Sequence, residues 1–191
     1  MPMKRSVLRW LLLGIVVLLG GATWLYLRGP AFWQRQYYPL HYEAQIADSA
    51  ARHKVSPYLV AAVVNAESGW KPGTRSAAGA IGLMQVLPST AADLARRGEV
   101  DKRRFPPNAL DDPAVNVEYG TAYLRFLVGR YHVVETALAA YNAGLRHADE
   151  WAAKGGDIRT AIGFPETRHY VLSVMRGRDR YMRLYPRAFS R

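Results

Sequence analysis

One carboxylate, Glu67, ends an apolar, helix-like run and directly precedes a segment rich in glycine and small residues; residues 61–90 read AAVVNAESGWKPGTRSAAGAIGLMQVLPST. A carboxylic acid acts as a general acid near neutral pH only when burial or negative potential raises its pKa. A helix end supplies such potential, because its free carbonyl groups carry about half a negative charge. The pattern is consistent with acid chemistry over a cleft, although most glutamates at helix ends are solvated and have no catalytic role.

No second acid lies near Glu67 in the sequence, since no other Asp or Glu occurs up to Thr90. Ordinary glycosidases use two carboxylates that lie about 5 to 9.5 Å apart. A single local carboxylate favours a reaction in which one group alternately donates and accepts a proton. The alternative is a distant acid that folds into the cleft, for which the candidates are Asp111, Asp112 and Glu135.

The elements that position these residues are predicted to be helices, because no alternating strand pattern occurs. Ser56-Pro57 is a good N-cap and first-turn pair for the helix that carries Glu67, and Gly69 is its expected end. Further helices are expected over 41–53, from Pro88 towards Gly98, from Asp112-Pro113 to Tyr131, and over 133–141, 145–153 and 166–181. The fold class is therefore all-α.

The helix that begins at Asp112-Pro113 is expected to be the longest and to form the core. It carries an apolar stripe on one face, made of Val117, Tyr123, Leu124, Leu127 and Val128.

Length and composition limit the class of protein. With 191 residues, of which 50% are hydrophobic, we expect one folded domain plus an appendage. The absence of cysteine excludes disulfides, thiol catalysis and cysteine zinc sites. The net charge of +11 suggests an anionic partner, but no nucleic-acid motif is present. No metal or other cofactor is expected, because the five histidines lack ligand spacing and no phosphate-binding glycine motif occurs.

The N-terminal segment is predicted to cross a membrane. Trp10 to Leu27 contains no charge over 18 residues, about 27 Å of helix, which just spans a bilayer. Lys4, Arg5 and Arg9 precede it, so the short N-terminus should stay in the cytoplasm. The predicted organisation is an anchor at 1–28, an interfacial linker at 29–40 and a catalytic domain at 41–191. A cleaved signal peptide is the alternative.

Several blocks together resemble the catalytic domain of lytic transglycosylases of the soluble type, family 1, over residues 42–180. The blocks are ESGW at 67–70, SAAGAIGLMQV at 76–86, PSTA at 88–91, NVxxGxxYL at 116–124, AAYNAG at 139–144 and PETRxYV at 165–171. The resemblance implies a lysozyme-like, mainly helical domain that cuts the β-1,4 bond between N-acetylmuramic acid and N-acetylglucosamine in peptidoglycan. The family cleaves without water and leaves a 1,6-anhydro end.

The resemblance also implies roles for individual residues. Glu67 corresponds to the single acid and base, and Tyr170 to a tyrosine that hydrogen-bonds it. Other positions correspond to substrate contacts: Ser76, Gly82, Met84, Gln85, which would offer its amide, Tyr141 and Asn142. Met84 would press on a sugar, and the alternative for it is a plain core position. Glu166 and Arg168 are expected to pair within the domain. Ala78 departs from the pattern, because some members have a second serine there.

The favoured interpretation is a peptidoglycan lyase that is anchored in the inner membrane and faces the periplasm. Two alternatives remain, a hydrolytic muramidase and a noncatalytic scaffold that binds peptidoglycan. Partners in wall growth or in a secretion machine are compatible with the sequence, which identifies none of them.

Overall fold

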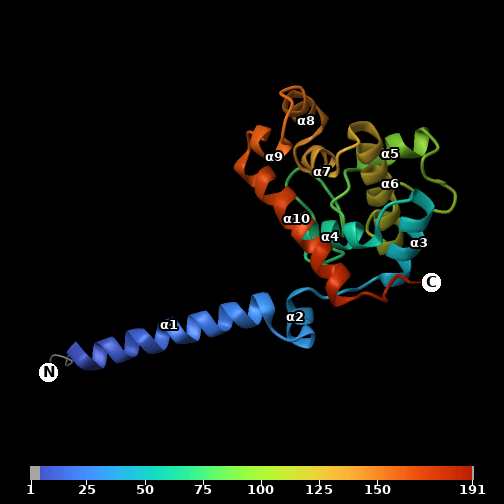
Figure 1. Ribbon diagram of the computed structural model, residues 1–191. Coiled ribbons are helices and arrows are strands. Elements are labelled where there is room, and N and C mark those ends of the chain that lie inside the picture. Colours follow the sequence, from blue (N-terminus) through green and yellow to red (C-terminus); the bar gives the residue numbers. More distant parts are fainter. Residues whose placement is uncertain (1–4, 191) are drawn as a thin grey trace. The chain divides into compact units, whose positions relative to one another are not determined.

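The computed structural model describes residues 5–190, and over this range it contains helices, turns and isolated bridges but no β-strand. The prediction of an all-α fold is confirmed. The chain divides into two compact units, one up to Leu40 and one from His41 onwards (Figure 1).

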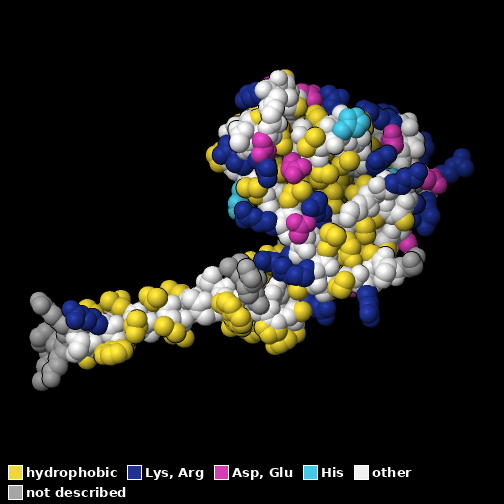
Figure 2. Space-filling view, viewed as in Figure 1, with side chains coloured by type: hydrophobic (Ala, Val, Ile, Leu, Met, Phe, Trp, Pro, Cys, Tyr) yellow, Lys and Arg dark blue, Asp and Glu magenta, His cyan; other side chains and the backbone are white. Residues whose placement is uncertain are grey.

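The N-terminal unit consists of α1, Arg5–Arg28, and the short α2, Ala31–Tyr37. The segment Ser6–Tyr26 is long and apolar enough to cross a bilayer, and none of it is buried within the protein. Figure 2 shows hydrophobic side chains along α1. The composition of 29–40 predicts only a linker and does not reveal α2. The amide of Gln34 donates to the carbonyl oxygen of Gly29 over 2.6 Å and so stabilises the corner between the two helices.

The second unit is built from eight helices among the described residues. In chain order they are α3 Glu43–His53, α4 Pro57–Ser68, α5 Pro88–Arg96, α6 Pro113–Tyr131, α7 Val134–Ala143, α8 Leu145–Ala152, α9 Ile158–Ala161 and α10 Pro165–Leu184. α10 packs along α4 and also contacts α7, whereas α6 packs against α3, α5 and α7 (Figure 1). α7 is deeply enclosed, because its residues from Ala137 to Ala140 have no exposed surface.

The ends of the helices follow the sequence signals in most places. Gly69 ends α4 in the left-handed conformation, at φ 56°, which glycine adopts at little cost. The carboxylate of Asp112 accepts hydrogen bonds from the amides of Ala114 and Val115 and so caps α6. Ser56 occupies the N-cap position of α4, but its side chain makes no capping hydrogen bond.

The prediction for the core helix is wrong in two respects. α6 has 19 residues whereas α10 has 20, so α6 is not the longest helix of this unit. Its burial is not a stripe either, since every residue from Val115 to Ala122 is buried. Helices α3, α5 and α7 all pack against α6. Some positions of α6 that the helical periodicity assigns to solvent are therefore buried, and polar side chains at these positions have hydrogen-bond partners inside the protein.

Glu118 is the charged member of this buried stretch, at 3% exposure. Its carboxylate accepts hydrogen bonds from Arg52, at 2.6 Å for the closest, and contacts the ring of His53 at 2.9 Å. Burial opposes ionisation of Glu118, but the hydrogen bonds from His53, Arg52 and Ser49 outweigh it and lower its pKa to about 2. The network fastens α3 to α6.

Candidate active site

Glu67 lies in the last turn of α4, and its carboxylate accepts a 2.7 Å hydrogen bond from the hydroxyl of Tyr170 on α10. Burial raises the pKa of Glu67 to about 7, and the hydrogen bond from Tyr170 lowers it by a smaller amount. At neutral pH this carboxyl is therefore poised between its protonated and ionised forms, which suits a group that donates and then accepts a proton.

Tyr141 on α7 lies near enough to the acid for the charge of Glu67 to affect its phenol. Burial and, after it, the charge of Glu67 raise the pKa of the Tyr141 phenol well above its usual value, so Tyr141 stays neutral. Its hydroxyl donates to the carbonyl oxygen of Met84 over 2.8 Å. This bond fastens α7 to the irregular segment between α4 and α5 that carries Ser76, Met84 and Gln85.

Ser76 lies exposed on that irregular segment. Its side-chain oxygen accepts a hydrogen bond from the amide of Ala80 over 3.0 Å. The hydroxyl hydrogen of Ser76 has no acceptor within residues 5–190, so it is available to a ligand. The amide of Ser76 donates in turn to the carbonyl of Ala80, which holds the turn closed.

Met84 does not present its side chain to the cleft, because it has no exposed surface at all. Its sulfur packs against Gly120 on α6, where an added Cβ would lie 2.5 Å from it. The prediction that Met84 lies against a sugar is therefore wrong for its side chain. Gly82 is buried as well, at φ 80°, and an added Cβ there would collide with the amide of Asn116. Gly82 thus allows close packing on α6.

Asn116 holds this packing together, a role that the sequence interpretation missed. Its oxygen accepts from the amide of Met84 over 2.8 Å, and its nitrogen donates to the carbonyls of Ile81 and Leu110 over 2.7 and 2.9 Å. Asn116 is the first residue of the NVxxGxxYL block, so the sequence does mark this position. The motif alone does not show that its side chain holds the fold together.

Gln85 uses its amide within the protein. The side-chain nitrogen donates to the carbonyl oxygens of Thr74 and Gly82 over 3.0 and 2.9 Å. Because carbonyls only accept, this fixes the orientation of the amide. The expectation that Gln85 offers its amide to the glycan is corrected in part, since only its oxygen remains for a ligand. Gln85 also adopts a left-handed backbone conformation, at φ 48°.

Asn142 is exposed at the end of α7, and its amide is oriented by α10. The hydroxyl of Thr167, itself 1% exposed, donates to the oxygen of Asn142 over 2.8 Å. The nitrogen of Asn142 is left as a donor towards solvent. Thr167 was not singled out from the sequence, although it stands in the PETRxYV block.

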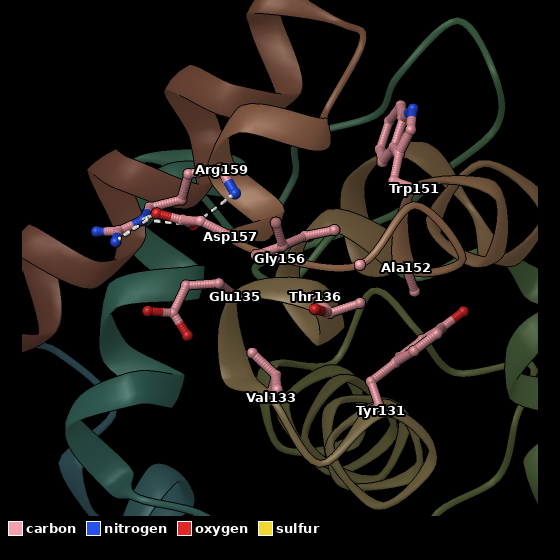
Figure 3. Close-up of a pocket in the computed structure, with 11 residues that line it drawn as sticks. Tyr131, Val133, Glu135, Thr136, Trp151, Ala152, Gly156, Asp157 and Arg159 are labelled. Carbon is pink, nitrogen blue, oxygen red and sulfur yellow. Dashed lines mark hydrogen bonds and ion pairs between the residues drawn. The ribbon is translucent and has the colours of Figure 1, made fainter.

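The three distant acids have other positions. Asp111 is exposed and pairs with Arg75 at 2.7 Å, and Asp112 caps α6. Glu135 lines the cavity in Figure 3, at the start of α7, while Tyr141 lies near the other end of the same helix. Burial accounts for the raised pKa of Glu67, the hydrogen bond from Tyr170 partly offsets it, and no second carboxylate contributes.

Two further expectations concern residues around the site. Arg168 donates to the carbonyl of Ile162 over 2.7 Å, and exposed Glu166 has no ion pair within the described range, so the two do not pair as predicted. Across residues 5–190, no group of three or more His, Cys, Asp or Glu side chains is arranged to hold a metal ion.

The comparisons with known proteins all point to one family, the lytic transglycosylases. Residues 45–161 match the model of the transglycosylase SLT domain. The soluble lytic murein transglycosylase of Salmonella typhimurium is 29% identical over 173 residues, which is 87% of this chain and 26% of that protein. The membrane-bound lytic murein transglycosylase C of Actinobacillus pleuropneumoniae is 30% identical over 78% of this chain and 47% of its own.

The fold is similar to that of the 70 kDa soluble lytic transglycosylase of Escherichia coli, with a TM-score of 0.72 and 28% identity over 78% of this chain. This chain spans only 25% of the E. coli structure.

Proposed function

Since the chain belongs to the transglycosylase SLT domain family, we propose that it is a membrane-anchored lytic transglycosylase. It cleaves the β-1,4 bond between N-acetylmuramic acid and N-acetylglucosamine in peptidoglycan and leaves 1,6-anhydro-muramyl ends. The observation that carries the proposal is the environment of Glu67, which is largely enclosed and accepts a hydrogen bond from Tyr170, and whose pKa is raised by burial to about 7.

The proposed reaction needs one carboxyl group. Glu67 begins protonated and gives its proton to the glycosidic oxygen as the bond from that oxygen to C1 breaks. The resulting carboxylate then takes the proton of the C6 hydroxyl of the same muramyl residue, whose oxygen forms the new bond to C1. Glu67 ends protonated, so no proton is gained or lost, and no water is consumed.

The other polar groups of the site would position the glycan. Ser76 offers a hydroxyl donor, Gln85 an amide oxygen and Asn142 an amide nitrogen. These donors and acceptors match the hydroxyl and acetamido groups of the sugars. Tyr170 would hold Glu67 in one orientation throughout the two proton transfers.

The anchor is proposed to be α1, with the catalytic domain on the periplasmic side of the inner membrane. Three features support it: the apolar segment Ser6–Tyr26, the preceding Arg5, and the membrane-bound name of one relative. A cleaved signal peptide passes the same length test. The net charge of the whole chain, +11, would favour its approach to an anionic wall or membrane.

The test is digestion of purified peptidoglycan by the full chain in detergent, followed by mass spectrometry of the fragments. Anhydro ends are expected. Reducing ends would show instead that the protein is a hydrolytic muramidase. If no fragments form, the protein is a noncatalytic scaffold that binds peptidoglycan. Glu67→Gln should abolish cleavage, since the amide can neither give nor take the proton. Glu166→Gln, which removes an exposed acid without an ion pair, is the matched control and should cleave normally.

A further inference from the structure

We propose that a basic face of α10 binds the anionic phospholipid headgroups of the bilayer that holds α1. The basic face consists of three arginines on the helix and one in the turn that follows it: Arg176, Arg180, Arg183 and Arg187. The inference rests on the membrane anchor of the proposed function and adds to it a second contact with the same bilayer.

Most of the net charge of the second unit lies in one short segment. Residues 41–175 carry 15 lysines and arginines against 14 aspartates and glutamates, so this part of the chain is almost neutral. Residues 176–190 carry five arginines and one acid, Asp179, which pairs with Arg178 at 2.7 Å. The positive potential of the unit is therefore concentrated around the second half of α10, where it can attract an anionic surface.

The basic face lies on the side of α10 that does not pack against the rest of the unit. A step of four residues leads from Arg176 to Arg180, and a step of three leads from there to Arg183, so the three side chains share one side of the helix. Arg176 and Arg183 are exposed, and Arg180 is half-buried. The buried residues of α10 occupy other positions: Thr167, Val171, Val174, Gly177, Tyr181 and Leu184.

The turn after α10 is fastened to the fold, so Arg187 has a fixed place beside the helix. The hydroxyl of Tyr58 on α4 donates to the carbonyl oxygen of Tyr185 over 2.9 Å, and the ring of Tyr58 lies 5.1 Å from the ring of Phe189. The amide of Ala188 donates to the same carbonyl group of Tyr185 over 3.1 Å. Exposed Arg187 therefore extends the basic face beyond the end of the helix.

Arginine is well suited to phosphate groups. Its planar guanidinium remains charged at any physiological pH and can donate two parallel hydrogen bonds to phosphate oxygens. Within residues 5–190, neither Arg176 nor Arg187 uses its guanidinium in an ion pair or a hydrogen bond. Both groups are thus available to the phosphate of a lipid headgroup.

The short connection to α1 favours the bilayer over other anionic surfaces. Residues 29–40 separate α1 from the second unit, and even a fully extended chain of this length reaches only about 40 Å. The headgroups are therefore always within reach, and docking is an intramolecular step for which a weak contact is sufficient. A dissolved anionic polymer has no such advantage.

Docking through the basic face would leave the active site open to the glycan. Tyr170 precedes Arg183 by 13 residues, which corresponds to about 20 Å along α10. The half of α10 that carries Tyr170 and Thr167 contributes no arginine to the basic face. One half of this helix would hold the domain on the bilayer while the other half orients Glu67 and Asn142.

The test follows the distance between α10 and the headgroups with one fluorescent label. The chain contains no cysteine, so Met182→Cys, at a position that is 48% exposed, provides a single thiol. The labelled full chain is reconstituted into vesicles that carry a nitroxide quencher on some headgroups, made of phosphatidylcholine either alone or with added phosphatidylglycerol. We expect stronger quenching with phosphatidylglycerol. The difference should vanish in about 1 M salt, where the Debye length is about 3 Å.

Arg176→Gln combined with Arg187→Gln should weaken the docking of the labelled chain. Each basic side chain near an anionic membrane changes the docking equilibrium about fivefold, so the loss of two should lower it about 25-fold. The matched control combines Arg103→Gln with Arg125→Gln, which removes the same charge from two other exposed positions and should leave the quenching unchanged. Both double variants should digest peptidoglycan like the wild type, which shows that they are folded.

Equal quenching in the two kinds of vesicle, or an equal loss in the two double variants, would overturn the basic face as a lipid site. Release of the label from anionic vesicles by soluble glycan strands with stem peptides would assign the face to the wall polymer and also overturn the proposal. An alkaline wash of the vesicles distinguishes this failure from that of the anchor. Protein that stays in the vesicles without added quenching overturns the docking alone, whereas protein that washes out overturns the anchor as well.

Discussion

Tyr170 donates a 2.7 Å hydrogen bond to Glu67 across 103 positions of sequence. The two residues belong to α10 and α4, which pack along each other. Two effects oppose each other at Glu67. Its burial raises the pKa, whereas the hydrogen bond from the phenol of Tyr170 favours the ionised form and lowers the pKa. Burial has the larger effect.

Tyr170→Phe should therefore raise the pKa of Glu67 above about 7, since it removes the hydrogen bond and keeps the ring. We expect the alkaline limb of the pH–rate profile to move to higher pH. The maximal rate should fall roughly tenfold as the carboxyl loses its fixed orientation. Peptidoglycan digestion across a pH series measures both. Tyr58→Phe serves as control, and an unchanged alkaline limb would contradict the assignment.

Glu67 should make the protein less stable at high pH than at low pH. Its folded pKa of about 7 lies above the ordinary value of 4.5, so between these values the folded state holds a proton that the unfolded chain has lost. The stabilisation is complete below about pH 4.5 and is lost as pH rises through about 7, which amounts to about 3 kcal/mol.

Glu67→Gln lacks this pH dependence. Chemical denaturation should show the variant gaining about 3 kcal/mol relative to the wild type between about pH 4.5 and about pH 8. A constant difference across that interval would mean that Glu67 titrates at an ordinary pKa.

Glu118→Gln should destabilise the domain by about 1 to 3 kcal/mol at neutral pH, because it removes the charge from a buried group that accepts hydrogen bonds from partly exposed Arg52. The folded pKa of about 2 is depressed, so the stabilisation is present above 4.5 and is lost as pH falls towards 2. Chemical denaturation of wild type and variant above pH 4.5 and near pH 2 measures this loss of stabilisation. Exposed Glu99 supplies the control as Glu99→Gln, and equal effects of the two changes would refute a special role for Glu118.

Replacing two glycines of α6 by alanine should change the stability of the protein in opposite directions. Gly120→Ala places a Cβ 2.5 Å from the sulfur of Met84, so we expect a loss of about 1 to 3 kcal/mol from overpacking. At Gly129 an added Cβ meets nothing within 4 Å, so Gly129→Ala should stabilise the helix by about 0.5 to 1 kcal/mol. Thermal unfolding of both variants measures the pair, and the same sign for both would contradict the packing.

The predictable part of this protein is the part set by local rules. Gly69 ends α4 because glycine readily adopts positive φ, and Asp112 caps α6 because a carboxylate before a proline can accept from the first free amides. The sequence singled out Glu67 by its place at the end of an apolar helix, but it identified Tyr170 only through the family resemblance. Their 2.7 Å contact joins helices that no local pattern connects.

The errors fall where long-range contacts decide the direction of a side chain. Met84 and Gln85 are neighbours in an irregular segment, and nothing in their order reveals that Met84 turns inward to Gly120 while Gln85 folds back on two carbonyls. The all-round burial of α6 escaped the periodicity argument for the same reason. Polar Asn116 and Glu118 look solvent-facing until their partners on other segments are known.

The position of Tyr170 on α10 makes the orientation of Glu67 depend on a residue 103 positions further along the chain. α10 spans Pro165–Leu184 and supplies both Tyr170, which bonds Glu67, and Thr167, which orients Asn142. A chain that lacks α10 loses both contacts at once, the hydrogen bond from Tyr170 to Glu67 and the hydrogen bond from Thr167 to Asn142. Two side chains carried by α4 and α7 therefore depend for their orientation on the packing of one helix that follows both in the chain.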